Sequence, residues 1–349
     1  MTPWLWAAAL GALVVLLGML PLLPALIEWR RGRSNTLHIP DDDDAGARFF
    51  AQRMRARIRE DFGDPHDLRR VGASSAYRLA GSSPLDGSYG RADTSNPTLV
   101  GVRVTLADGC RYFGEIVAFE HLTAGAGAIV RAALVESGDA VLGERVSVLR
   151  WIDAHSITTD NDCRLLGRAT AATAIRLGAR TEFRRMAAPL IETAGHFDRP
   201  EVVTAIDAAL DEASGSAFIE RPDRQGRWCA RGDVRIPAGV RVSGNVIVEG
   251  SLEIGEGCEI IGSLKAYRHL SIGRSVRVHG SVFAGGRIDI GSSAMIDGIV
   301  SSELRVHVDA GVHIGREGRE ASVLAPEIRL GAANRIHGSV WAGREGRVQ

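Results

Sequence analysis

The chain has 349 residues, 45% of them hydrophobic and 24% charged, and its formal net charge is zero. This composition excludes an extended disordered chain, and the zero net charge gives no overall attraction to nucleic acid, so we expect no nucleic-acid partner. The four cysteines lie far apart, without a CxxC pair or a histidine at zinc-ligand spacing. We expect them to be small buried side chains in a reducing compartment. They are Cys110, Cys163, Cys229 and Cys258.

The amino-terminal segment, residues 1–29, is predicted to be a transmembrane anchor. The run from Trp4 to Ile27 carries no charge, and as a helix it is about 36 Å long, enough to cross a bilayer. A cleaved signal peptide is the alternative, but the positive n-region and the small-residue cleavage site are missing. Arginines follow the run at once, so the positive-inside rule places the bulk of the chain in the cytoplasm, below a bacterial inner membrane. The anchor residues are Trp4, Trp6, Trp29, Arg30, Arg31 and Arg33.

Residues 30–97 are predicted to form a juxtamembrane helix and a linker. In "ARFFAQRMRARIRE", Phe50, Met54 and Ile58 recur at helical spacing, and arginines fill most other positions. Such a basic amphipathic helix either lies on anionic lipid or packs on its own domain. The run Asp41 to Asp44 lacks the glycine and glutamate of a calcium loop and is read as a solvated spacer. Residues 63–97 are rich in Gly, Ser, Pro and Asp, which favours a linker.

Residues 98–195 are predicted to be a first β-rich region. "LVGVRVTL" alternates in polarity, and after the turn Asp108-Gly109 comes "RYFGEIVAF", an expected hairpin partner. Two Leu-Gly pairs stand 35 residues apart, close to twice 18, so the region is interpreted as a degenerate β-helix. Residues 196–231 are expected to be a helical linker, with a short helix over Arg199 to Gly215.

Residues 232–342 contain an 18-residue repeat with a finer period of six. Apolar ladder positions recur every 18 residues, and the last step is 22, as if four residues were inserted near "REGREA". Three six-residue units per repeat predict an all-β fold, a parallel β-helix with three short strands per rung. Residues 343–349 are expected to be a tail. The predicted core ladder is Ile236, Ile254, Ile272, Ile290, Val308 and Leu330.

The repeat region resembles the bactofilins, a family of bacterial polymer-forming cytoskeletal proteins. The resemblance rests on "IGEGCEIIGSL", "IGRSVRVHGSV", "IGSSAMIDGIV" and "LGAANRIHGSV". It implies a right-handed β-helix that assembles into filaments. The spacing alone does not distinguish this hand from the left-handed hexapeptide helices, which share the six-residue period. The long amino-terminal half and the anchor depart from the simple family plan.

The function expected from these features is a membrane-anchored scaffold that polymerises end to end without nucleotide. A β-helix leaves backbone donors and acceptors on its terminal rungs, and no capping helix follows the last rung. We therefore expect the carboxy-terminal end to be an assembly contact, and no GxxxxGK phosphate loop is present. The expected partners are further copies, inner-membrane lipid and client proteins that the sequence does not identify. No catalytic, cofactor or metal site is expected. The candidate end-contact residues are Ile336, Val340 and Trp341.

Two other functions remain open at this point. A hexapeptide-repeat acyltransferase would use one histidine as general base in a cleft between subunits. Against it, His279 and His337 occupy the same place in two rungs, which suggests surface repetition rather than one catalytic residue. An envelope adhesin or scaffold requires the reversed topology. The histidines that the acyltransferase hypothesis could use are His269, His279, His307, His313 and His337.

Overall fold

The structure is a computed structural model that describes residues 46–62, 76–90, 96–195, 206–207 and 227–349. The chain divides into two compact units, Met1–Gly46 and Ala47–Gln349, and the described residues from Ala47 onward belong to the second. The expected anchor, residues 1–29, lies outside the described residues. Among those described, no helix combines the length and the apolar character that crossing a bilayer requires.

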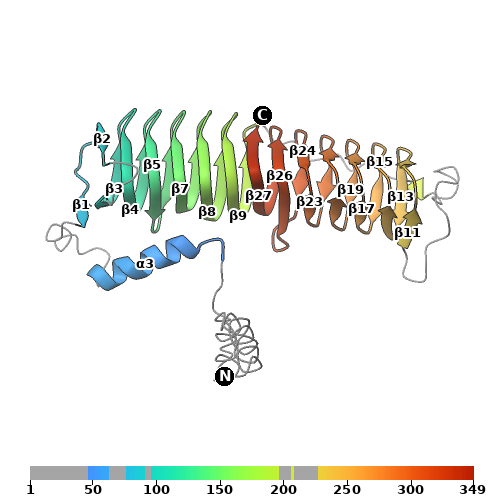
Figure 1. The fold of residues 1–349 in the computed structure, drawn as a ribbon, viewed down its shortest axis with the longest axis horizontal. Helices are drawn as coiled ribbons and strands as arrows, with labels where there is room; N and C mark the ends of the chain where they lie inside the picture. Colours follow the sequence, from blue (N-terminus) through green and yellow to red (C-terminus); the bar gives the residue numbers. More distant parts are fainter. Residues whose placement is uncertain (1–45, 63–75, 91–95, 196–205, 208–226) are drawn as a thin grey trace, which may run out of the picture. The chain divides into compact units, whose positions relative to one another are not determined.

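The second unit is an all-β rod, a parallel β-solenoid of about 13 turns (Figure 1). This confirms the fold class expected from the repeat, and the solenoid includes the first β-rich region as well as the second. One continuous core cluster runs through the rod and contains buried residues from both regions. For clarity, the first half denotes residues 77–193 and the second half residues 206–348.

In the second half, most turns contain three short strands, and each strand from β10 to β23 pairs in parallel with the strand three places further along the chain. The six ladder residues, Ile236 to Leu330, lie in register from turn to turn and are buried. The strands are β10 Ile206–Asp207, β11 Arg227–Ala230, β12 Val234–Ile236, β13 Val240–Ser243, β14 Asn245–Val248, β15 Leu252–Ile254, β16 Glu259–Ile261, β17 Leu264–Ala266, β18 Leu270–Ile272, β19 Arg277–Val278, β20 Val282–Ala284, β21 Ile288–Ile290, β22 Met295–Ile296, β23 Val300–Ser302, β24 Arg305–Val308, β25 His313–Ile314, β26 Ala321–Leu330 and β27 Arg335–Val348.

Four of the six ladder residues are followed by a glycine, which the stacking of the turns requires. A Cβ added at Gly273 would lie 2.8 Å from the backbone nitrogen of Glu256 in the preceding turn. No side chain fits at that distance, so the Ile-Gly dipeptide marks a corner where two backbones approach closely. The 22-residue step from Val308 to Leu330 is explained by a loop between β25 and β26, where Arg316 and Arg319 form a tight bridge.

The first half is built from longer strands that bend across two faces of the rod. The expected hairpin between residues 98–106 and 111–124 is wrong, because these strands pair in parallel, with Leu99 beside Ile116. The chain advances a full turn between the two strands, as the solenoid requires, instead of reversing at Asp108-Gly109. The strands are β1 Tyr77–Leu79, β2 Ser88–Tyr89, β3 Thr98–Leu106, β4 Arg111–Ala124, β5 Ile129–Val135, β6 Asp139–Leu142, β7 Ser147–Thr159, β8 Arg164–Leu177 and β9 Glu182–Thr193.

The two halves run in opposite directions along the rod and meet at its centre (Figure 1). The last strand of the first half, β9, pairs antiparallel with the last strand of the second half, β27. The carboxy-terminal rung was expected to be uncovered, and this expectation is wrong. The backbone of β9, in the same chain, pairs with the edge of that rung. Most of residues 343–349, expected as a tail, belong to β27, and Gly346 and Arg347 pair with β9.

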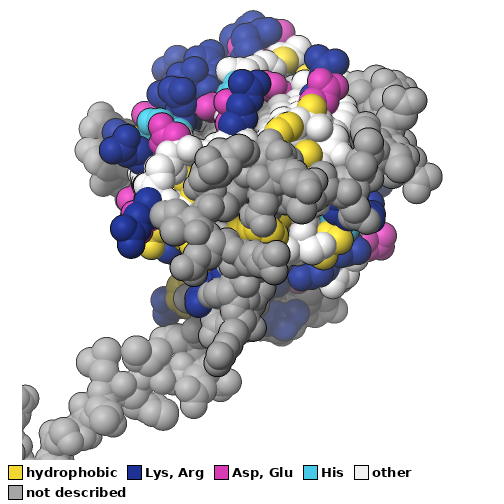
Figure 2. Space-filling model, turned by 90° about the vertical axis from the view of Figure 1, so that its right-hand side faces the viewer, with side chains coloured by type: hydrophobic (Ala, Val, Ile, Leu, Met, Phe, Trp, Pro, Cys, Tyr) yellow, Lys and Arg dark blue, Asp and Glu magenta, His cyan; other side chains and the backbone are white. Residues whose placement is uncertain are grey.

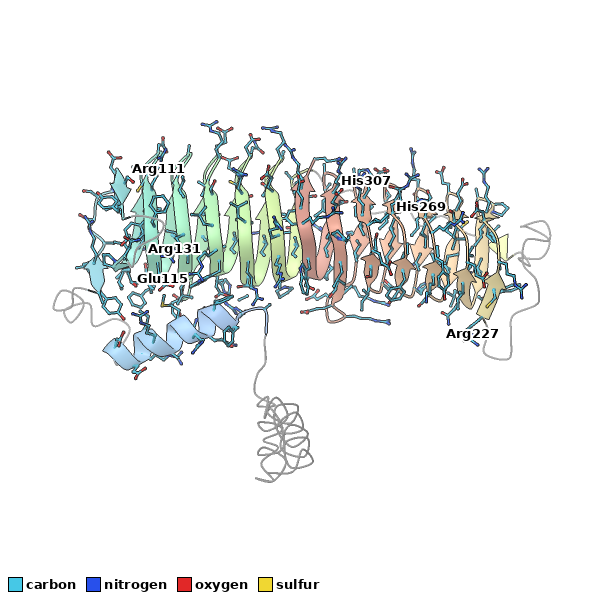
Figure 3. All side chains as sticks on the ribbon, in the orientation of Figure 1. Arg111, Glu115, Arg131, Arg227, His269 and His307 are labelled. Atoms are coloured by element: carbon cyan, nitrogen blue, oxygen red, sulfur yellow. The ribbon has the colours of Figure 1, made fainter. Side chains whose placement is uncertain are left out.

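The helix α3, Phe49–Phe62, packs against the outside of the first half (Figures 1 and 3). Its apolar face, Ala51, Met54 and Ile58, is buried in a small cluster with outward-facing side chains of the sheet, including Phe119 and Trp151. The sequence left two possibilities for this helix, binding to anionic lipid or packing on its own domain. In the structure it packs on its own domain. The apolar face of α3 is consequently not available to lipid, whereas Arg53, Arg57 and Arg59 remain exposed.

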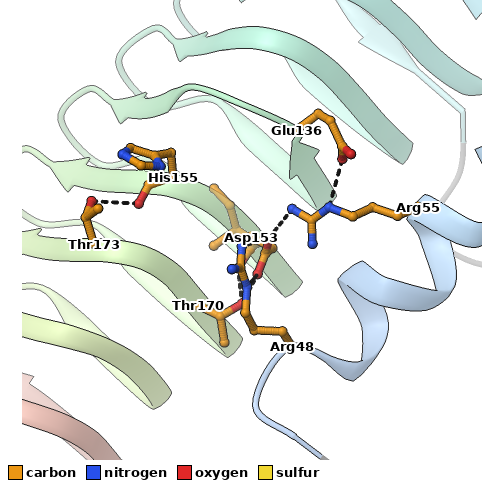
Figure 4. A network of polar contacts seen from close by, with 8 residues as sticks. Arg48, Arg55, Glu136, Asp153, His155, Thr170 and Thr173 are labelled. Atoms are coloured by element: carbon orange, nitrogen blue, oxygen red, sulfur yellow. Dashed lines mark hydrogen bonds and ion pairs between the residues drawn. The ribbon is translucent and has the colours of Figure 1, made fainter. Parts of the chain in front are cut away.

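A buried carboxylate fastens α3 to the sheet (Figure 4). Asp153 on β7 is 1% exposed and accepts hydrogen bonds from Arg48 at 2.6 and 2.8 Å, from Arg55 at 2.8 Å and from the Thr170 hydroxyl at 2.6 Å. Arg55 also donates to Glu136 at 2.8 Å. The carboxylate raises the pKa of Arg48 through this hydrogen bond and through its charge. Two guanidinium groups thus compensate one buried charge, as a carboxylate in this position requires.

Several segments expected to be linker are strands. Within the expected helix over Arg199 to Gly215, Ile206 and Asp207 form β10 and pair with β13. Residues 227–230, assigned to the linker, form β11 and pair with β14. Residues 77–79 and 88–89 likewise pair with β3 and β4. Pairing with an available neighbouring strand overrides local propensity at these positions.

Candidate functional site

The seam between β9 and β27 is the feature that distinguishes this molecule from a simple solenoid. Its central pairs are Ile336 with Ile191 and Val340 with Met186, and all four side chains are buried. The candidate end-contact residues therefore do lie at an end-to-end contact, but within one chain. The third of them, Trp341, faces outward, is 45% exposed and pairs with Arg185.

Side chains at the corners of the seam add polar contacts. Thr193 donates its hydroxyl to the Gly331 carbonyl at 2.8 Å and accepts the backbone N–H of Asn334 at 2.8 Å. Arg335 forms an ion pair with Glu192 at 3.0 Å. The His337 ring lies 3.0 Å from the Pro189 carbonyl, to which its Nδ1–H donates. These polar contacts add to the backbone pairing of β9 with β27, which is interrupted after Ile336 and after Trp341.

A close fit inside the seam depends on Gly346. A Cβ at this position would lie 2.1 to 2.6 Å from ring atoms of Phe183, which is 2% exposed. Phe183 thus fills the core at the junction only because its partner in β27 has no side chain. This pair could have been noticed in the sequence only if the antiparallel pairing had already been known.

The five candidate histidines are spread over the second half and are held by neighbouring groups rather than gathered in a cleft. The His307 Nε2 lies 3.1 Å from Asp309, and His269 Nδ1 accepts the backbone N–H of Arg287 at 3.2 Å. Burial lowers the pKa of His313 to about 4, and the nearby Arg335 and His337 act in the same direction. A groove of about 500 Å³ at one corner of the seam contains no histidine in its lining.

The fifth histidine, His279, bridges two carboxylates. Its Nε2 lies 3.0 Å from Glu259, and its Nδ1 lies 3.3 Å from Asp297. Hydrogen bonds from His279 and Arg241 lower the pKa of Glu259. Because both ring nitrogens are engaged, His279 ties neighbouring turns together and is poorly placed to remove a proton from a substrate.

Charged rows of this kind cover much of the rod. Arg235 lies 3.4 Å from Glu253 and Arg241 lies 2.6 Å from Glu259, in each case one turn apart. Figure 2 shows basic and acidic side chains interleaved on the upper surface at the end of the second half. Such surface pairs contribute about 0–1 kcal/mol each to stability.

The cysteines and the described acidic side chains are the remaining candidates for a reactive or metal-binding site. Burial raises the pKa of Cys163 to about 11 and also raises the pKa values of Cys110 and Cys258. Contrary to expectation, Cys229 is exposed, because it occupies an outward position in β11. Among the described residues, no group of three or more His, Cys, Asp or Glu side chains is placed to hold a metal ion.

Comparison of the chain with protein-family models, with curated proteins and with solved structures found no match.

Proposed function

We propose that the protein is a scaffold that polymerises end to end through its β-solenoid, without nucleotide, in the manner of the bactofilins that its repeats resemble. The observation that supports this most is the seam. It is a junction of two solenoid ends through paired strand edges, so the sequence already contains one such contact inside a single chain. The same type of contact between the outer ends of two rods would extend a filament.

The outer ends belong to the first turns of the two halves. In the first half, β1 pairs with β3, and Leu79 of β1 is 49% exposed. In the second half, β11 pairs with β14. Because both last turns are joined at the seam, each new copy in the proposed filament joins through a first turn. A right-handed coil is part of this proposal, following the resemblance.

The membrane part of the proposal rests on the sequence. Residues 4–27 would hold the scaffold at the bacterial inner membrane, with the rod in the cytoplasm on the side of Arg30, Arg31 and Arg33. A reporter fused to the carboxy terminus tests this topology. Activity of a reporter that works only outside the cytoplasm would refute it and would favour the envelope scaffold instead.

A solenoid is compatible with a scaffold and with an acyltransferase. We favour the scaffold because His279 is held between two carboxylates, which occupy both of its ring nitrogens. Calorimetry with acyl-CoA tests the rival directly. Saturable binding that one histidine substitution abolishes would overturn the scaffold assignment.

Electron microscopy of the purified full chain in detergent tests polymerisation. We expect filaments or sheets for the unmodified protein and for Leu166→Arg, a substitution at a 38% exposed leucine in the middle of the rod. Leu79→Arg, at the outer end, should give short particles, because a charge at a strand edge opposes edge pairing. Single rods for the unmodified protein at high concentration would refute the proposal.

A further inference from the structure

The helix α3 lies on a surface of the rod that combines apolar side chains with carboxylates. The apolar part includes Phe119, Leu134 and Trp151, which face outward from the sheet and are buried beneath α3. The carboxylates are those of Asp153 and Glu136, which bind arginines of the helix segment (Figure 4). An anionic bilayer also presents an apolar layer bordered by negative charge. The rod therefore holds α3 through the same two kinds of interaction that such a bilayer offers.

The helix segment carries the side chains that both surfaces require. Residues 47–62 contain five arginines and two acidic residues. Ala51, Met54 and Ile58 form the apolar face, and all three are buried against the rod. Because this face cannot contact the rod and a bilayer at once, the two surfaces compete for it. A helix of 14 residues is only marginally stable in water by itself, so α3 depends on one of the two surfaces to stay folded.

The docked helix also has basic and aromatic groups that face solvent. Arg53 and Arg59 are exposed. Phe50 stacks with Trp151 at a centroid distance of 6.5 Å, and it is nevertheless 42% exposed. A lipid surface that approaches the outer side of α3 meets these groups before any contact with Asp153 is broken. Binding to lipid can therefore begin while the helix is still docked.

We propose that α3 is a switch helix that transfers from the rod to an anionic lipid surface. On transfer, Arg48 and Arg55 exchange the carboxylates of the rod for lipid phosphates, and the apolar face exchanges the sheet for the boundary between headgroups and acyl chains. The rod surface beneath the helix then becomes exposed to water. The proposal rests on the membrane location in the proposed function, because the chain from Ile27 to Arg48 spans at most about 75 Å and keeps α3 near the bilayer.

The transfer requires lipid that is negatively charged. A neutral bilayer offers an apolar boundary but no net charge to replace the two carboxylates of the rod. A free phosphate ion replaces the carboxylates but offers no apolar boundary to Met54 and Ile58. A ligand shifts an equilibrium only by the difference in its affinity for the two states. We therefore expect α3 to stay on the rod at a neutral membrane or in phosphate solution, and to leave the rod at an anionic membrane.

Thiol labelling of the full chain in vesicles tests the proposal. In a Cys229→Ser background, the protein carries either Ala132→Cys, in the buried cluster under α3, or Ala133→Cys, in the core of the rod. The vesicles contain phosphatidylcholine alone or with phosphatidylserine. With phosphatidylserine, we expect a water-soluble thiol reagent to modify position 132 several-fold faster than in neutral vesicles. Position 133 should react at the same slow rate in both.

Charge variants separate the attraction to lipid from the docking on the rod. Arg53→Gln combined with Arg59→Gln removes charge from α3 but leaves its bonds to Asp153 in place, so it should abolish the faster labelling in anionic vesicles. Arg329→Gln, at an exposed arginine of β26, is the control and should leave the faster labelling unchanged. Asp153→Asn weakens docking without changing α3, so it should accelerate labelling at position 132 in neutral vesicles already.

Three results would overturn the proposal. Equal labelling of position 132 in neutral and anionic vesicles would show that the helix stays on the rod. Equal acceleration at positions 132 and 133 would show that anionic lipid loosens the whole rod instead of moving α3. Inorganic phosphate that accelerates labelling as much as anionic vesicles do would show that a free anion is sufficient.

Failure of this proposal is distinct from failure of the proposed function. If the chain does not float with neutral vesicles, the amino-terminal anchor is refuted, yet selective acceleration at position 132 in anionic vesicles still supports the switch helix. Filament formation is measured separately by microscopy, and it depends on the outer ends of the rod rather than on the transfer of α3.

Discussion

Removing the carboxylate of Asp153 should weaken the docking of α3 on the rod without unfolding the rod. Asp153 is 1% exposed and joins Arg48 and Arg55 at 2.6 to 2.8 Å. Breaking a fully buried pair costs about 3–5 kcal/mol. The Arg48 side chain is 34% exposed and can regain water, so we expect a loss below this range, about 2–3 kcal/mol, for Asp153→Ala. Burial of Met54 and Ile58 would still favour the docked helix.

Hydrogen exchange measures this effect locally. A loss of about 2–3 kcal/mol corresponds to amide exchange roughly 30 to 150 times faster over residues 49–62. The strands of the second half should exchange at unchanged rates. Asp153→Asn should give a smaller increase, because an amide still accepts one hydrogen bond but carries no charge. Glu120→Ala, which removes an exposed ion pair with Arg103, is the control and should change little. Unchanged exchange in α3 would show that Asp153 does not hold the helix on the sheet. Equal acceleration everywhere would show that Asp153 stabilises the whole fold.

Further predictions concern the seam, pH and the thiols. Gly346→Val should lower the melting temperature markedly, because the added side chain would collide with Phe183. Gly343→Val is the control and should have little effect, because a Cβ at that position lies 3.5 Å from its nearest neighbouring atom. Equal melting temperatures of the two variants would contradict the seam packing. The pKa of His313 is lowered to about 4, so its contribution to stability is present above its unfolded pKa of about 6.5 and is lost as pH falls toward 4. Denaturant titrations should show this loss, and it should be weaker in His313→Gln; identical pH profiles would exclude the histidine as the cause. A thiol reagent should modify Cys229 in the folded protein, and it should modify the three buried cysteines only after unfolding. Fast reaction of the buried cysteines in the folded protein would contradict their burial. They are Cys110, Cys163 and Cys258.

Much of the solenoid could be predicted from the sequence because the same pattern of apolar residues recurs in every turn. Ile254, Ile272 and Ile290 are 18 residues apart, and each must lie above the last for the core to be continuous. The degenerate first half retained enough of this period to be recognised as a β-helix. Strands β3 and β4 were nevertheless expected as a hairpin, since Asp108-Gly109 is also a common hairpin turn. Only the stacking of whole turns shows that the chain continues forward.

The candidate contact at the carboxy-terminal rung shows what the repeat could not predict. Ile336 and Val340 were expected to meet another copy, and they meet Ile191 and Met186 of the same chain. The docking of α3 was likewise open, because an amphipathic pattern specifies an apolar face but not its partner. The partner became clear from Asp153, a single acidic residue in a strand, which gives no signal in the sequence by itself.

The sequence by itself determined the period, the inward ladder and the all-β solenoid, because these depend on contacts between residues one turn apart, which the repeat specifies many times. The tertiary structure decided which edges meet and in which direction. Every turn of a solenoid presents the same backbone donors and acceptors at its edge, so the backbone does not distinguish one end from another. The choice depends on fits such as Phe183 against Gly346, between residues far apart in the chain that only the folded rod brings together.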